Sequence, residues 1–146
     1  MAELYPALEQ RLAVVLRDPE EARDVAQEAY LRAYRSWSRF DGTDARAWLF
    51  TIGLRLAFNE LRRRRGWLNA LRRVEAPREW SPPSDPDLWE AIGQLEARHR
   101  AALVLHVVDG YTQAEIAGML GVPGGTVASW IGRAKASLRA ALEGEA

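Results

Sequence analysis

Residues 109–134 read DGYTQAEIAGMLGVPGGTVASWIGRA, and their spacing predicts two helices joined by a tight turn. Thr112 and Glu115 have the spacing of a capping box, which starts a short helix. Gly121 suits the left-handed backbone that such a turn needs, and a second amphipathic helix follows it. This is the helix-turn-helix pattern, whose second helix can enter a DNA major groove. The same turn also joins helices in small bundles for packing reasons, so the pattern alone leaves both interpretations open.

The surrounding residues extend this helical unit in both directions. Two short helices are predicted at residues 87–95 and 98–108, and we expect His106 to pack among its apolar neighbours Leu103, Leu105 and Val107. The inward residues of the first motif helix are Ile116, Ala117 and Leu120. The last helix should end near residue 142, with a buried stripe of Val127, Ile131, Ala134 and Leu138. Its outward residues are Thr126, Ser129, Trp130 and Arg133.

Four prolines punctuate the chain between residues 75 and 87 and oppose regular structure there. We interpret residues 75–86 as a linker between an N-terminal domain, residues 1–74, and a C-terminal domain, residues 87–146. Each domain is near the lower size limit for an independent core. Neither shows the alternating pattern of a strand, so we predict an all-α fold with two small helical domains.

The N-terminal domain is predicted to contain three helices. The first covers residues 6–17, and Asp18 with Pro19 starts a second that reaches about Trp37. The apolar stripe of this second helix is Ala22, Val25, Ala26, Ala29, Ala33 and Trp37, and its opposite face holds Asp24, Gln27, Glu28, Leu31 and Arg35. Asp44 caps a third helix that continues to about Arg65 and aligns a polar stripe of Thr51, Arg55, Asn59 and Arg62. Gly53 in this helix indicates either close packing or mere tolerance of glycine.

Charge is distributed unevenly although the chain of 146 residues has a formal net charge of zero. Residues 1–74 hold 14 arginines against 10 acidic residues, and residues 75–146 hold 6 basic against 10 acidic residues. Residues 55–73 contain seven arginines and one acidic residue, Glu60. Arginine is suited to forked phosphate contacts and to stacking on bases, although arginine bias from a GC-rich genome fits equally well.

Several classes of protein are excluded by what the sequence lacks. There is no cysteine, and His99 and His106 alone cannot complete a metal site, so we expect an intracellular chain without metal. No apolar run approaches the roughly 18 residues of a membrane span, and residues 1–10 do not resemble a secretory signal. We found no Gly-rich phosphate loop, His-Glu-x-x-His motif or Gly-x-Ser-x-Gly turn. We therefore predict no catalytic site, no cofactor and no membrane insertion.

Two separate motifs resemble the same protein family. Residues 109–117, with Gly125–Thr126–Val127 and Arg133–Ala134, are similar to region 4 of bacterial sigma factors. Residues 24–34, DVAQEAYLRAY, with Phe40 and residues 46–50, RAWLF, resemble their region 2. The lack of a region 3 between them points to the extracytoplasmic-function (ECF) group of the sigma-70 family.

This resemblance implies a cytoplasmic protein that binds core RNA polymerase and directs promoter-specific initiation. The residues expected to bind polymerase, on its β′ clamp, are Asp24, Gln27, Glu28 and Leu31. The residues expected at the minus-10 element are Phe40, Trp48, Arg55, Asn59, Arg62 and Arg63. The residues expected at the minus-35 element are Gly125, Thr126, Ser129, Trp130 and Arg133. The β flap and an anti-sigma protein are further expected partners, and Arg62–Arg65 would hold phosphates at the end of their helix.

The chain departs from the family at both promoter-binding helices. Gly53–Leu54–Arg55 stands where the family often has asparagine, and Ala128 and Trp130 replace common cations on the last helix. Its remaining cations are Arg133, Lys135 and Arg139, so minus-35 binding is expected to be weak or unusual. Two alternatives therefore stay open: a sigma-like decoy that binds an anti-sigma protein, and a stand-alone helix-turn-helix repressor.

Overall fold

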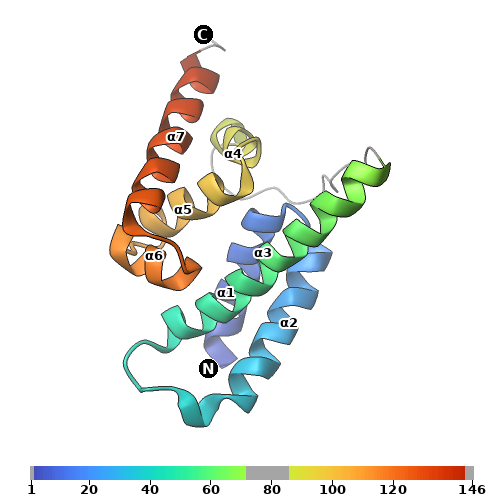
Figure 1. Cartoon of the computed structure of the whole chain (residues 1–146), viewed down its shortest axis with the longest axis vertical. Coiled ribbons are helices and arrows are strands. Elements are labelled where there is room, and N and C mark those ends of the chain that lie inside the picture. The colour runs from blue at the N-terminus through green and yellow to red at the C-terminus, as the bar shows by residue number, and fades with distance from the viewer. Residues whose placement is uncertain (1, 72–85, 144–146) are drawn as a thin grey trace. The chain divides into compact units, whose positions relative to one another are not determined.

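The computed structural model describes residues 2–71 and 86–143, which form α-helices and short 3₁₀ turns with no strand among them (Figure 1). This confirms the predicted all-α class. The chain divides into two compact units, residues 1–80 and 81–146. Most of the predicted linker lies outside the described residues, and Pro86 is the first residue of helix α4. No described helix is both long and apolar enough to cross a membrane.

Unit 1 is built from α1 (Tyr5–Leu16), α2 (Pro19–Arg35) and α3 (Ala45–Leu71), each of which contacts the other two. On α2 the four alanines of the predicted stripe are completely buried, and such small side chains let neighbouring helices approach closely. Large apolar side chains from α1 and α3 fill the remaining core: Leu8, Leu12, Leu49, Phe50 and Leu54. The core therefore holds α2 rigidly while its other face stays in solvent.

Local capping sets where these helices begin. The Asp18 carboxylate accepts hydrogen bonds from the backbone N–H groups of Glu20 at 3.1 Å and Glu21 at 3.2 Å. The Asp44 carboxylate accepts one from the N–H of Ala47 at 2.9 Å. Each bond satisfies a donor that the first helical turn leaves without a partner. Both predicted caps are confirmed.

Two predicted helix ends differ from the structure. Helix α2 ends at Arg35, and the short 3₁₀ helix η2 (Trp37–Arg39) follows it. The change of backbone at Ser36 takes Trp37 out of the α-helical register, so the prediction that Trp37 is buried was wrong: its side chain is 49% exposed. Helix α3 continues to Leu71, which places the arginine run 62–65 inside the helix and not at its end.

Gly53 is required by close packing between α3 and α1. A Cβ atom at this position would lie 2.7 Å from Cδ1 of Leu8, and Leu8 is completely buried. This distance is shorter than a side-chain contact allows. Of the two interpretations that the sequence left open, the structure supports close packing.

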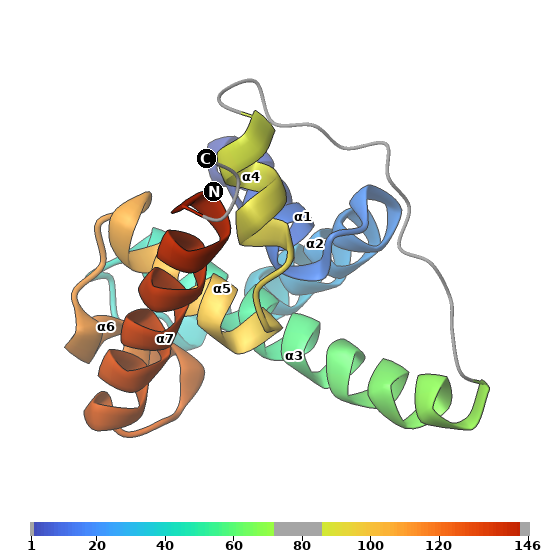
Figure 2. The same cartoon turned by 90° about the horizontal axis from the view of Figure 1, so that it is seen from above.

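Unit 2 consists of α4 (Pro86–Gly93), α5 (Ala97–Val107), α6 (Gln113–Leu120) and α7 (Gly124–Glu143) (Figure 2). Helices α6 and α7 form the predicted helix-turn-helix. Thr112 and Glu115 make both bonds of the capping box, and Gly121 adopts the left-handed conformation with φ of 68°. Helix α7 packs against α4, α5 and α6. These three helices therefore share one core with α7 and fix its position in unit 2.

Several details of the unit 2 core depart from expectation. Met119 is buried, whereas Ala117 and Leu120, which we placed among the inward residues, are only partly buried, as is Leu138 of the predicted α7 stripe. Val107 is 61% exposed and so does not enclose His106. The His106 ring instead lies 2.7 Å, at Nδ1, from the carbonyl oxygen of Tyr111, which ties the end of α5 to the segment before α6.

Candidate functional site

An acidic and polar surface covers the outer side of α2. Asp24 and Gln27 are exposed, and Leu31 is an unusually exposed leucine, with 47% of its surface in solvent. Glu28 is partly exposed and pairs with Arg32 at 3.0 Å between Oε1 and Nε. The structure therefore brings all four predicted polymerase-binding residues together on an accessible side of one helix.

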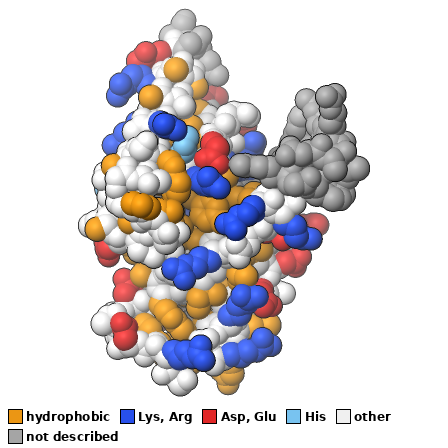
Figure 3. Space-filling model, in the orientation of Figure 1, with side chains coloured by type: hydrophobic (Ala, Val, Ile, Leu, Met, Phe, Trp, Pro, Cys, Tyr) orange, Lys and Arg blue, Asp and Glu red, His pale blue; other side chains and the backbone are white. Residues whose placement is uncertain are grey.

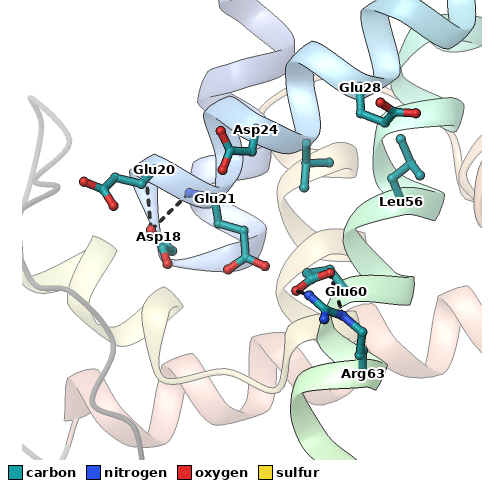
Figure 4. Close-up of a pocket in the computed structure, with 9 residues that line it drawn as sticks. Asp18, Glu20, Glu21, Asp24, Glu28, Leu56, Glu60 and Arg63 are labelled. Atoms are coloured by element: carbon teal, nitrogen blue, oxygen red, sulfur yellow. Dashed lines mark hydrogen bonds and ion pairs between the residues drawn. The ribbon is translucent and has the colours of Figure 1, made fainter. Parts of the chain in front are cut away.

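This surface continues into a pocket between α2 and α3 (Figure 4). Leu56 and Val25 supply apolar lining, and Arg63 also lines the pocket. Six carboxylates surround it: Asp18, Glu20, Glu21, Asp24, Glu28 and Glu60. The sequence pattern placed Asp24 and Glu28 on one face of this helix but left out Glu20, which lies four residues before Asp24. Glu60 joins them from another helix, and only the packing of α2 against α3 reveals that. A pocket with this lining favours a cationic ligand group.

The arginine run of α3 has three different environments. Arg63 binds Glu60 of the same helix, and this hydrogen bond raises the pKa of the Arg63 guanidinium. Arg64 reaches α2, where its Nη2 lies 3.5 Å from Oδ2 of Asp18 and also pairs with Glu21. Arg62 is exposed and makes no ion pair within the described part of the chain. The prediction that all of Arg62–Arg65 contact phosphate must therefore exclude Arg64, because its guanidinium already forms ion pairs within the chain.

Arg55, Asn59 and Arg62 are all exposed along one side of α3, as their helical spacing predicts. Thr51, which starts the same stripe, donates its hydroxyl to the Ala47 carbonyl at 2.7 Å and so offers no free donor. Figure 3 shows blue arginine side chains spread among apolar ones over the visible face of unit 1. The exposed side chains of Arg55, Asn59 and Arg62 thus form a short polar stripe.

Three aromatic rings, from Trp37, Phe40 and Trp48, contact one another in the segment that connects α2 to α3 and at the start of α3. Ring centroids are 5.2 Å apart for Trp37 and Phe40, 5.1 Å for Phe40 and Trp48, and 5.9 Å for Trp37 and Trp48. The structure thereby joins the two aromatic residues predicted for the minus-10 element and adds Trp37. Sequence periodicity missed Trp37 because it assigned this residue to the buried side of α2.

The loop after Phe40 is held by its own hydrogen bonds. The Asp41 carboxylate accepts from the backbone N–H of Thr43 at 3.0 Å and from its hydroxyl at 2.7 Å. These bonds, the backbone one foremost, lower the pKa of Asp41 below its ordinary value. Gly42 between them has φ of 86°, a conformation that glycine adopts without strain. The loop therefore holds a defined shape next to the aromatic rings.

The predicted minus-35 residues lie on the accessible part of α7. Gly125, Ser129 and Arg133 are exposed, and Thr126 and Trp130 are partly exposed. Ala128, where the family commonly has a cation, is also exposed, so its methyl group leaves an uncharged gap in this surface. Within the described ranges, no three acidic or histidine side chains are placed to share a metal ion.

Comparison with known families matches both units. Residues 1–67 match sigma-70 region 2, and residues 86–138 match sigma-70 region 4. RNA polymerase sigma-H factor of Pseudomonas aeruginosa is 33% identical over 147 residues, which cover 88% of this chain and 76% of that protein. ECF RNA polymerase sigma factor SigL of Mycobacterium tuberculosis is 34% identical over 86% of this chain and 77% of its own length.

Two solved structures are similar over nearly the whole chain. The sigma factor RpoE of Bartonella quintana, in complex with the anti-sigma factor NepR, has a TM-score of 0.81 at 24% identity and covers 97% of this chain and 93% of its own, which supports the fold. CnrH, in complex with the cytosolic domain of CnrY, has a TM-score of 0.67 at 30% identity and covers 97% and 84% of the two chains.

Proposed function

Since this chain belongs to the sigma-70 family, as an ECF-type sigma factor, we propose that it acts in the cytoplasm by binding core RNA polymerase and directing initiation at specific promoters. Sigma factors are not enzymes, and the polymerase supplies the chemistry of RNA synthesis. The observation that supports this function best is within unit 1, where an acidic surface and a cationic stripe occupy adjacent helices. One small unit can therefore bind protein and DNA at once.

Helix α2 is the proposed polymerase-binding element, through Asp24, Gln27, Glu28 and Leu31 on the β′ clamp. Leu31 offers an exposed apolar anchor, and the neighbouring polar groups can form the hydrated rim that surrounds such anchors in protein interfaces. In the adjoining acidic pocket, Glu20 and Asp24 would accept a lysine or arginine of the partner, because the other four carboxylates already pair with arginines of this chain. Charge complementarity of this kind mainly speeds and orients association.

The minus-10 element would be held open against α3 and the loop before it. Separating a duplex costs base-stacking energy, which aromatic surfaces and cations can offset on the displaced strand. Phe40 and Trp48 supply rings, and the polar stripe supplies phosphate and base contacts through Arg55, Asn59 and Arg62, with Arg63 next to it in the chain. Phosphate contacts make this binding strongly dependent on salt.

Helix α7 would read the minus-35 element through Gly125, Thr126, Ser129, Trp130 and Arg133, and unit 2 would also meet the β flap. Residues 75–146 have a net charge of −4, with 6 basic and 10 acidic residues. They can therefore neutralise few phosphates, and DNA binding by unit 2 alone should be weak. We retain residues 75–86 as the linker between domains 1–74 and 87–146. A linker that spans both sites raises the affinity of two weak modules through effective concentration.

An anti-sigma protein is a proposed further partner, since the similar sigma factor RpoE was solved in complex with the anti-sigma factor NepR. The uncharged gap at Ala128 favours one second candidate, a decoy that binds an anti-sigma protein without serving promoters. A repressor that acts without polymerase is disfavoured by the exposed acidic surface of α2, which suits a protein partner and not a phosphate backbone.

One assay separates these functions: transcription by core polymerase, with and without the purified chain, on promoters selected from a random DNA pool. Initiation that depends on both proteins supports a sigma factor. Capture of an anti-sigma protein with no transcript from any template supports the decoy. Duplex operator binding without polymerase supports the repressor.

A further inference from the structure

Tyr5 begins α1 and lies against the acidic and polar surface of α2. Its ring meets the ring of Tyr30 edge to face, with centroids 5.7 Å apart and an interplanar angle of 78°. Aromatic pairs attract at this separation, so the contact with α2 holds the ring in place. The Tyr5 hydroxyl donates to the backbone carbonyl oxygen of Arg23 on α2, at 3.5 Å. The sequence patterns that indicated polymerase contacts did not include any residue of α1.

The same hydroxyl makes a second hydrogen bond, with the side chain of Gln27. A phenol has one proton to donate, and that proton is used by the Arg23 carbonyl, which can only accept. The Gln27 amide nitrogen is therefore the donor in the second bond, and the Tyr5 oxygen accepts. Burial raises the pKa of the Tyr5 hydroxyl, and the Gln27 bond opposes this rise, as a bond donated to the oxygen should.

This bond fixes which end of the Gln27 amide is available to a partner. An amide carries one oxygen that accepts and one nitrogen that donates, and it exchanges them by turning over. With the nitrogen held by Tyr5, the exposed side chain of Gln27 is left to offer its Oε1 oxygen. Asp24 is exposed three residues earlier on the same face, and its carboxylate also accepts. The two residues together suit the N–H groups of a lysine or arginine.

We propose that Tyr5 is a positioning residue for polymerase binding, which orients the Gln27 amide so that its oxygen faces an N–H donor of the polymerase beside Asp24. The inference rests on the proposed function, and it adds a residue of α1 to a surface formed by α2. Tyr5 acts through Gln27 and not by touching the polymerase. A long side chain that is ordered before binding loses less conformational entropy in the complex, and this difference is the contribution of Tyr5.

The direct test measures the affinity of the full chain for purified core polymerase in the absence of DNA. We expect Tyr5→Phe, which removes the hydroxyl but keeps the ring, to weaken binding about fivefold, the scale of ordering one flexible side chain. Tyr30→Phe is the matched control, because it removes the other hydroxyl of the same ring pair, and it should bind like wild type. An equal loss in both variants would overturn the proposal, because the effect would then come from the ring pair.

Combination with Gln27→Ala shows whether Tyr5 acts through Gln27. Gln27→Ala alone should weaken core binding at least as much as Tyr5→Phe does. Adding Tyr5→Phe to Gln27→Ala should cause no further loss, because no amide remains to be oriented and the two effects are coupled. A loss from Tyr5→Phe that persists in the Gln27→Ala background would overturn the proposal, and so would Gln27→Ala that binds like wild type.

The side-chain amide of Gln27 gives a second readout, which a general loss of stability would not move. In the free wild-type chain, NMR should show one Gln27 amide proton shifted by its bond to the Tyr5 oxygen. In Tyr5→Phe, where the ring remains, both amide protons should have the chemical shifts of a solvated glutamine. Gln27 resonances that are the same in the two proteins, or that are already solvated in wild type, would refute the hydrogen bond and the proposal with it.

The binding data separate this inference from the proposed function. If the wild-type chain does not bind core polymerase, the proposed function itself fails. If wild type binds and Tyr5→Phe binds equally well, the function stands and the role of Tyr5 is refuted. Thermal unfolding checks that each variant is folded at the temperature of the assay.

Discussion

Asp18 links the start of α2 to the arginine run of α3. One carboxylate oxygen caps the helix through the N–H groups of Glu20 and Glu21, and the other lies 3.5 Å from Nη2 of Arg64. The side chains of Arg64, Asp18 and Glu21 are 28%, 19% and 17% exposed, so these ion pairs are largely shielded from solvent. Arg62, two residues earlier in the chain, is exposed. Neighbouring arginines therefore have separate roles, one structural and one available to DNA.

The first prediction compares Arg62→Ala with Arg64→Ala. Arg62→Ala should weaken open-complex formation and reduce the slope of log affinity against log salt by about one, because one phosphate contact is lost. Arg63→Ala should act in the same direction. Arg64→Ala should instead lower the free energy of unfolding by about 1–2 kcal/mol, between the values for exposed and buried ion pairs, without changing the slope.

Salt titrations of open-complex formation and thermal unfolding measure the two effects separately. Glu9→Gln on α1, where Glu9 pairs with Arg23 and not with Arg64, is the control for a general electrostatic effect. The assignment is wrong if Arg64→Ala flattens the salt dependence as Arg62→Ala does and leaves stability unchanged.

The second prediction concerns the pKa of Asp41, which the Thr43 hydrogen bonds lower. A lowered pKa in the folded state means that ionised Asp41 stabilises the loop above its unfolded pKa. This contribution is lost as the pH falls through the lowered folded value. Thr43→Ala removes the hydroxyl bond but keeps the backbone N–H, so the pKa of Asp41 should rise partway to its ordinary value. Carboxyl NMR titration measures it, and an unchanged pKa would show that the hydroxyl contributes nothing.

At the scale of elements, local signals determined which helix boundaries could be predicted. The caps at Asp18 and Asp44 and the capping box at Thr112 depend on residues within one turn, so their residue types indicated them correctly. Trp37 could not be placed in the same way, because the switch from α2 to η2 depends on backbone geometry at Ser36 that periodicity does not contain. Site residues that share one helix, such as those on α2 and α7, could be predicted from helical spacing. Site residues that come from two elements, such as those of the pocket between α2 and α3, could not.

The third prediction tests the contact between α1 and α3. Gly53→Ala gains about 1 kcal/mol of helix propensity, but the added methyl group must displace buried Leu8, and such overpacking costs about 1–3 kcal/mol. We expect a net loss of roughly 1 kcal/mol in the free energy of unfolding. Gly132→Ala on α7 is the control, because nothing lies within 4 Å of its added Cβ, and it should stabilise the protein. Urea unfolding compares the two, and a stabilised Gly53→Ala would contradict the packing.

At the scale of the whole molecule, sequence patterns predicted two helical units and a helix-turn-helix, and family membership supplied the function. The acidic pocket was not predictable in full, because Glu60 of α3 comes near Asp18, the cap of α2, and Glu28 of α2 only after the helices pack. The arginine run 62–65 was also wrongly predicted to form one phosphate-binding surface. Helical spacing cannot show that Arg64 forms ion pairs with Asp18 and Glu21 from another part of the chain. Tertiary packing thus decides which charges remain available to partners.

Strand opening by unit 1 in the presence of core polymerase is the central activity proposed for this protein. Permanganate reactivity of thymines in the minus-10 element of a selected promoter measures this directly, because permanganate oxidises unpaired thymines preferentially. We predict reactive thymines only when the chain and core polymerase are both present, and weaker reactivity with Arg62→Ala. Thymines that stay protected with both proteins bound, on every selected promoter, would contradict the account.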